Sequence, residues 1–170
     1  GFRGTFYSLT SEAVKHPEIV RDLFARGHEI AYHADVHFGF GKLPAAEQEL
    51  RIRFMKQQLQ TVLGDNIGHA TGFRAPTESY DANTETLLRR HGIRHHAADP
   101  SSTDDRLPFF SIAENGLGPD ENLVVLPRTQ WDDINFTYLH LSPGNIQRVM
   151  EYDLDLNVRS GAFGLLSVHS

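Results

Sequence analysis

Two histidines four residues apart, with an aspartate between them, are the part of this sequence best suited to chemistry. His33, Asp35 and His37 stand in the segment "AYHADVHFGF" (31–40), at the end of an apolar run and before a glycine-rich stretch. Imidazole is the commonest metal ligand in proteins, and its nitrogens bind zinc-type ions at about 2.0–2.1 Å. The pattern therefore predicts a metal site held by His33 and His37.

The spacing sets a condition on the backbone. Residues four apart in a continuous strand are separated by roughly 13 Å, because each residue advances about 3.3 Å. Adjacent turns of a helix, or a tight loop, would bring the two rings together. If both histidines bind one ion, the strand has to stop near His33 and the chain has to turn. Asp35 has three candidate roles, as a third ligand, a partner that holds an imidazole or a solvated residue, and we favour the last two.

The composition is typical of one globular domain, and we expect residues 1–170 to form a single domain. The net charge of −6 and the lack of a basic stripe argue against nucleic-acid binding. No apolar run approaches the roughly 18 residues of a membrane-spanning helix. The chain has no cysteine, which excludes disulfides and thiolate metal sites, whereas its 10 histidines are a high share.

Alternating strands and helices must position the candidate residues. Residue types and turn signals predict strands at 4–9, 28–33, 69–76, 93–99, 122–129 and 161–169. Helical periodicity and capping residues predict helices at 16–27, 43–64, 81–92 and 142–154. In the helix at 43–64 we expect Leu50, Phe54 and the Val62/Leu63 pair to be buried. The alternation indicates an α/β fold in which helices cover a parallel sheet.

In such folds the catalytic groups lie at the carboxyl ends of the strands, and the suggestive residues of this chain follow the expected strand ends. They are His33 and His37, Arg74, Asp99, the group Arg128, Trp131 and Asp132, and His169. We expect them to converge on one mouth. His95 and His96 are adjacent on a strand and must point to opposite faces, so neither is assigned to the site.

Three segments, in order along the chain, carry a family resemblance. They are "GTFYSLTSEAVKHPEIVRDLFARGHEIAYHADVH" (4–37), "GFRAP" (72–76) and "GLLSVHS" (164–170). They resemble the polysaccharide deacetylases of carbohydrate esterase family 4. The resemblance implies a distorted parallel (β/α) barrel. It also implies hydrolysis of N-acetyl groups, which are C–N bonds other than peptide bonds, on an amino-sugar polymer.

The resemblance implies roles for particular residues. His33 and His37 would hold a divalent ion, usually zinc, with cobalt or nickel as alternatives. Arg74 would orient the catalytic base, Pro76 would shape the groove, and His169 would be the general acid. A glycan would be the partner molecule, and a location outside the cytoplasm or in the cell envelope follows from the resemblance alone.

Three further residues are candidates for substrate binding because of their chemical types. Trp131 is expected to stack on a sugar ring, and Asp132 and Asp133 to hydrogen-bond its hydroxyl groups. All three follow the expected strand at 122–129.

The sequence departs from the family at its beginning. The family's first motif is a pair of aspartates before the "TFY" strand, one the catalytic base and the other a metal ligand, and this chain begins at Gly1, after that point. We therefore expect a barrel without its first strand, in part of a longer chain. Two other functions stay open, a non-catalytic carbohydrate-binding or scaffold module and a hydrolase of a non-sugar amide.

Overall fold

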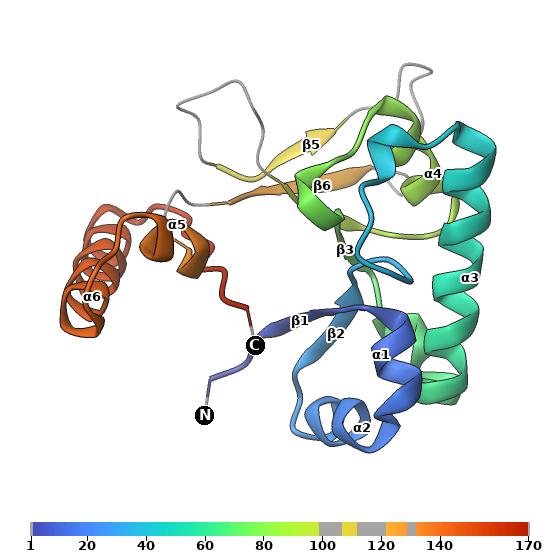
Figure 1. The fold of residues 1–170 in the computed structure, drawn as a ribbon, viewed down its shortest axis with the longest axis horizontal. Coiled ribbons are helices and arrows are strands. Elements are labelled where there is room, and N and C mark those ends of the chain that lie inside the picture. Colours follow the sequence, from blue (N-terminus) through green and yellow to red (C-terminus); the bar gives the residue numbers. More distant parts are fainter. Residues whose placement is uncertain (1, 99–106, 112–121, 129–131, 170) are drawn as a thin grey trace. The chain divides into compact units, whose positions relative to one another are not determined.

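A six-stranded sheet with the strand order β1-β2-β3-β4-β6-β5 forms the centre of the fold (Figure 1). The computed structural model describes residues 2–98, 107–111, 122–128 and 132–169. The pairs β1–β2, β2–β3 and β3–β4 are parallel. The expected α/β class with a mainly parallel sheet is therefore confirmed.

Most predicted elements are present, with somewhat shorter strands. The strands are β1 (Thr5–Ser8), β2 (Glu29–Tyr32), β3 (Gly72–Arg74), β4 (His95–Ala98), β5 (Phe109–Ser111) and β6 (Leu123–Pro127). The α-helices are α1 (Thr10–Lys15), α2 (Pro17–Ala25), α3 (Ala45–Leu63), α4 (Ala82–Arg90), α5 (Asp133–Tyr138) and α6 (Pro143–Ser160). Short 3-10 helices are η1 (Phe40–Lys42), η2 (Gly64–His69) and η3 (Pro76–Glu78). Among the described residues, no helix combines the length and apolar character needed to cross a membrane.

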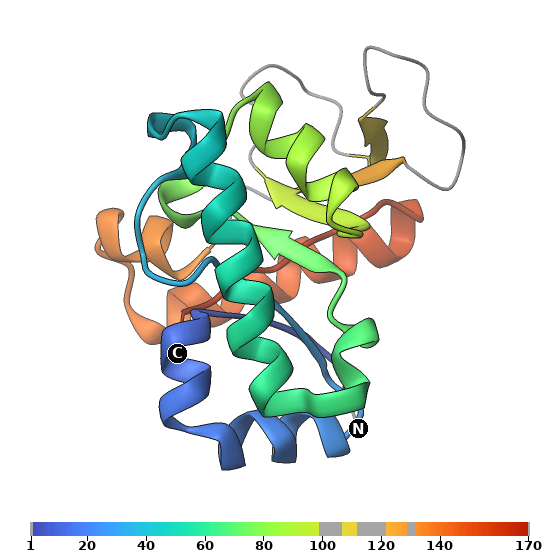
Figure 2. The same cartoon turned by 90° about the vertical axis from the view of Figure 1, so that its right-hand side faces the viewer.

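The chain divides into two compact units. The first contains Gly1–Ala97 and Phe110–Val125, and the second contains Ala98–Phe109 and Leu126–Ser170. Within the first unit, α3 and α4 cover one face of the strands, as Figure 2 shows from the helix side. The expectation of a single domain over residues 1–170 stays a prediction.

The core of the first unit lies between the sheet and its helices. Tyr32 and Phe73 are paired across β2 and β3, and both are fully buried in one cluster with residues of α3 and α4. The buried stripe of α3 is Gln48, Ile52, Met55, Leu59, Val62 and Leu63. The expectation for Leu50 and Phe54 was wrong, because their side chains are 66% and 48% exposed. They lie off this stripe, whose spacing of three and four residues continues from Gln48 rather than from Leu50.

The two adjacent histidines of β4 point to opposite faces, as expected. His96 is fully buried against Tyr80, with ring centroids 4.5 Å apart, and neither of its ring nitrogens has a hydrogen-bond partner among the described residues. His95 donates from Nε2 to Glu29 Oε1 at 2.8 Å on the other face. Its ring lies over Gly72, where an added Cβ would be 2.2 Å from His95 Cε1. Only glycine fits at position 72 while this imidazole is in place.

A left-handed residue stops β2 just beyond its last position. Ala34 has φ of 66° and is fully buried. Its carbonyl accepts a 2.9 Å hydrogen bond from the amide of Thr10, at the start of α1. Alanine rarely adopts this conformation, so the surrounding contacts must hold it. The turn that the His33–His37 spacing required is therefore present.

Arg51 of α3 holds the loop that follows this turn. Its Nε donates to Asp35 Oδ1 at 2.8 Å, Nη2 bonds the same oxygen, and Nη2 also reaches the carbonyl of Val36 at 3.2 Å. The guanidinium carbon lies 5.8 Å from the ring centre of Phe38 and 5.4 Å from that of Phe40. One cation thus contacts residues on both sides of His37.

Two features near the carboxyl terminus differ from the expectation. The predicted strand at 161–169 was wrong, since only an isolated parallel bridge forms there, between Asp132 and Ser167. The segment bends back on α6, where a Cβ at Gly164 would be 2.7 Å from the side-chain Nδ2 of Asn157. A strand needs a neighbour along its length, which this segment has at one residue. Helix α5 lies within a region expected to be loop.

We expect His96 to make folding sensitive to acid. Burial, reinforced by the charge of His95, lowers the pKa of His96 from 6.5 to about 3. The unfolded chain therefore binds the proton more tightly, and stability present above pH 6.5 is lost as the pH falls toward 3. The loss should approach about 1.4 kcal/mol per pH unit. We expect the free energy of unfolding, measured by denaturation from pH 7 to 4, to depend less on pH in His96→Leu than in the parent. The exposed-site variant His16→Leu should follow the parent. Equal slopes for all three chains would contradict this assignment.

Removing the Arg51 cation should destabilise the loop that carries His37. The Arg51 and Asp35 side chains are only 12% and 14% exposed, so Arg51→Met would leave a largely buried carboxylate without this partner. We expect the free energy of unfolding to fall by about 2–4 kcal/mol, and amide hydrogen exchange over residues 34–40 to accelerate. Arg53→Met is the matched control, because that side chain is 67% exposed and its ion pair contributes little. Similar losses in both variants would disprove this role of Arg51.

Candidate active site

The turn at Ala34 brings His33 and His37 together. Their ring centroids are 5.1 Å apart and the ring planes are inclined by 58°. Two imidazoles on one tetrahedral zinc would place their ring centres about 5 Å apart, given Zn–N bonds of about 2.0–2.1 Å. The pair therefore fits two positions of a zinc-type site.

A main-chain hydrogen bond orients the His33 ring. Its Nδ1 lies 2.9 Å from the carbonyl oxygen of Arg74, at the end of the neighbouring strand β3. A carbonyl only accepts, so Nδ1 carries a proton, and in the neutral imidazole Nε2 is then the nitrogen with the lone pair that a metal requires. Metal-binding histidines commonly have such a partner on the other ring nitrogen. The donor chemistry of His33 thus fits a metal ligand.

Among the described residues, no group of three or more His, Cys, Asp or Glu side chains could hold a metal ion. Asp35 is bound to Arg51 in a largely buried ion pair, so it is not the solvated residue that we favoured as one role. The two histidines are therefore a partial donor set. Further ligands would have to come from water, substrate or groups beyond the described residues.

Arg74 contacts both His33 and the carboxylate of Glu78. Its Nη2 lies 2.8 Å from Glu78 Oε1, and the two side chains are 12% and 22% exposed. Its carbonyl meanwhile holds His33. Pro76, expected to shape the groove, is buried at the start of η3 between these two charged residues. A role for Glu78 was not predicted from the sequence, although its position four residues after Arg74 is compatible with an ion pair.

Strained backbone is concentrated around these residues. The described non-glycine residues with positive φ are Ala34, Thr77, Glu78 and His140, with φ of 66°, 56°, 53° and 51°. Ala34 follows His33 directly, and Thr77 and Glu78 form the turn that presents the partner of Arg74. Such conformations cost about 1–3 kcal/mol each and persist where the surroundings impose them, often at functional sites.

The loop after His37 packs closely on the turn after Arg74. The amides of Phe40 and Gly41 donate to the carbonyl of Ser79 at 2.9 and 3.1 Å. A Cβ at Gly39 would lie 2.6 Å from Ser79 Cβ, so this approach requires glycine. The segments that follow β2 and β3 are thereby fastened to one another.

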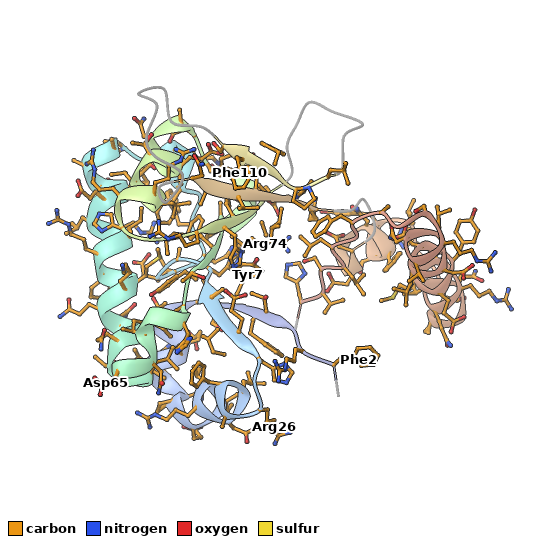
Figure 3. All side chains as sticks on the ribbon, turned by 180° about the vertical axis from the view of Figure 1, so that it is seen from behind. Phe2, Tyr7, Arg26, Asp65, Arg74 and Phe110 are labelled. Carbon is orange, nitrogen blue, oxygen red and sulfur yellow. The ribbon has the colours of Figure 1, made fainter. Side chains whose placement is uncertain are left out.

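A polar network lies on the sheet face opposite the helices. Tyr7 is paired with Ala31 and His95 with Gly72, which places them on the face that also carries Arg74. The Tyr7 hydroxyl lies 3.4 Å from His95 Nδ1, and Figure 3 shows Tyr7 next to Arg74. Burial, followed by the charge of Glu29, raises the pKa of Tyr7, and Arg74 opposes this shift. The network therefore places the Tyr7 hydroxyl, which burial keeps neutral, beside Arg74.

In the second unit, His169 is held by a carboxylate. Its Nδ1 lies 2.8 Å from Asp133 Oδ1, and its amide donates to Asp133 Oδ2 at 2.7 Å. The His169 side chain is 49% exposed. A carboxylate on Nδ1 holds an imidazole in one orientation, as acid–base catalysis requires. This function of Asp133 was not expected from the sequence.

Asp132 is fully buried rather than presented to solvent. It caps α5 by accepting from the amide of Asn135 at 2.8 Å, and it pairs with Arg128. These contacts disfavour direct binding of a sugar hydroxyl, and its substrate role stays a prediction. Trp131 and Asp99 lie outside the described residues. The structure thus brings His33, His37 and Arg74 together, whereas one mouth shared with His169 stays a prediction.

Comparisons of structure give the same fold in known proteins. A protein from Mycobacterium smegmatis assigned as a polysaccharide deacetylase has 25% sequence identity and a TM-score of 0.80, over 98% of this chain and 58% of that one. A protein from Pseudomonas aeruginosa PAO1 with the same assignment has 21% identity and a TM-score of 0.74, over 98% and 54%. Puue allantoinase has 20% identity and a TM-score of 0.75, over 96% and 54%. These last two show the fold alone, and the chain spans little more than half the length of each structure.

Comparisons of sequence are more specific. No curated protein matches the chain. The sequence profile described as polysaccharide deacetylase matches residues 1–96, which is more than half of the chain. The matched region contains His33, His37 and Arg74. The chain belongs to the polysaccharide deacetylase family.

Proposed function

We propose that this protein is a metal-dependent deacetylase, or part of one, that removes N-acetyl groups from an amino-sugar polymer. His33 and His37 are its proposed metal ligands. The observation that carries the proposal is the pairing of His33 and His37, with ring centroids 5.1 Å apart, in a chain of this family. The proposed metal is zinc, with cobalt and nickel as alternatives, because a pair of imidazoles suits these borderline ions.

The chain's own residues have separable tasks in this reaction. A divalent ion bound by His33 and His37 would lower the pKa of its water toward about 7 and polarise the acetyl carbonyl. The Arg74 carbonyl keeps the Nδ1 proton on His33, so that Nε2 stays the donor nitrogen. The Arg74 guanidinium, held by Glu78, would orient the group that accepts the water's proton.

His169 would complete the cleavage. Hydrolysis adds water across the amide, so the C–N bond breaks and the departing nitrogen has to gain a proton. In the proposed reaction His169, oriented by Asp133, gives that proton to the nitrogen, and the products are acetate and a free amino sugar. Stacking of Trp131 on a sugar ring is part of the same proposal.

The activity is tested by acetate release. The purified chain is loaded with zinc, cobalt or nickel and incubated with acetylated chito-oligosaccharides, peptidoglycan fragments and allantoin. Acetate from the sugars supports the proposal. Turnover of allantoin alone would favour the non-sugar amide hydrolase, a candidate suggested by the fold likeness to Puue allantoinase. Glycan binding without any turnover would favour a scaffold module.

The metal assignment predicts a specific loss of affinity. His33→Ala combined with His37→Ala should remove zinc binding measured by titration calorimetry, because both imidazole donors are lost. We expect affinity to fall by about a hundredfold or more. His16→Ala is the control, since that histidine is exposed between α1 and α2. Unchanged zinc affinity in the double variant would remove the basis of the proposed site.

The proton-donor assignment predicts graded effects in the second unit. His169→Ala should lower kcat for acetate release by about a hundredfold or more, as loss of a general acid does. Asp133→Asn keeps the shape but removes the carboxylate charge, and we expect a smaller loss in kcat. Asp155→Asn is the matched control, because its ion pair with Arg159 is exposed on α6. If Asp133→Asn and the control had equal kcat, Asp133 would have no part in proton transfer.

A further inference from the structure

Glu78 is a charged residue of this region to which the family resemblance assigns no role. It follows Arg74 by four residues and lies in η3, and its carboxylate receives the Arg74 guanidinium at 2.8 Å. Both side chains are largely shielded from water. Exposed ion pairs are weakly held, whereas a shielded guanidinium–carboxylate contact restricts the orientation of the arginine.

The backbone that presents Glu78 is unusual. Thr77 and Glu78 are consecutive non-glycine residues in the left-handed region. The amides of Glu78 and Ser79 donate to the carbonyls of Ala75 and Pro76, both at 3.1 Å, which closes a tight turn. A relaxed backbone at Glu78 would direct its side chain elsewhere. The strained turn and the ion pair therefore occur together.

The strained turn is also fastened from outside. The amides of Phe40 and Gly41 bind the carbonyl of Ser79, next to Glu78, and they belong to the loop that carries His37. Arg74 itself binds His33 through its carbonyl. The Arg74–Glu78 pair is thus connected through the main chain to both histidines of the candidate site.

We propose that Glu78 is a positioning residue, whose carboxylate, directed by the left-handed turn at Thr77 and Glu78, fixes the Arg74 guanidinium for the deacetylation reaction. This inference rests on the proposed function. Glu78 acts through Arg74 and need not touch the substrate.

Two glycine variants separate this role from a structural one. Glycine suits a left-handed position, so Thr77→Gly and Glu78→Gly both relieve the backbone and both should fold by circular dichroism. Only Glu78→Gly removes the carboxylate. We expect it to lower kcat for acetate release about ten- to hundredfold while KM changes less than about twofold. Glu78→Gln, which keeps the side-chain length, should behave likewise, whereas Thr77→Gly keeps the carboxylate and should lower kcat much less than either.

A second measurement does not depend on activity. The ¹⁵N–¹H signals of the Arg74 guanidinium, assigned with Arg74→Lys, should show restricted rotation in the metal-free parent and in Thr77→Gly. This restriction of the Arg74 guanidinium should be lost in Glu78→Gly and Glu78→Gln. Restricted rotation in all four chains, or an unchanged kcat in both Glu78 variants, would overturn the proposal. If the parent releases no acetate while the signals follow this pattern, the proposed function fails and the fixing of Arg74 by Glu78 stands.

Discussion

The abrupt end of β2 is the constraint on which the candidate site depends. Continued as a strand, the chain would carry His33 and His37 roughly 13 Å apart. The left-handed turn at Ala34 instead places their ring centroids 5.1 Å apart. Because the Ala34 side chain is fully buried and its carbonyl is bound by Thr10, the start of α1 contributes directly to this turn. A local backbone conformation, maintained by core packing, thereby brings the two histidines together.

Two arginines stabilise the irregular segments beyond the strand ends. Arg51 reaches from α3 to both sides of His37, and Arg74 connects β3 to the turn at Glu78. A guanidinium has several donors in a fixed plane, so it can satisfy carboxylate and carbonyl oxygens at once where regular backbone pairing has ended. Backbone pairing therefore holds the strands, and these charged contacts hold the loops that follow them. The same contacts can maintain the left-handed residues of these loops.

Local sequence signals predicted the regular elements well and the connections between distant residues poorly. Helix α4 begins within one residue of the predicted boundary at 81, where Asp81 and Thr84 form a capping box, and the turn after His33 follows from ligand spacing. The predicted burial of Leu50 and Phe54 was wrong because apolar type alone does not reveal which stripe of α3 meets the sheet. The strand predicted at 161–169 failed because strand formation requires a partner that residue types do not specify. Arg51 and Asp35 are 16 positions apart, and no pattern within one sequence pairs them.

The contact of His95 with Gly72 has a consequence for how this family can diverge. The imidazole occupies the space that any side chain at position 72 would need. A side chain at position 72 would expel His95 from its contacts with Glu29 and Tyr7, whereas a small residue at position 95 would leave room for it. In this fold, replacement of Gly72 is therefore compatible with the sheet only when position 95 changes as well.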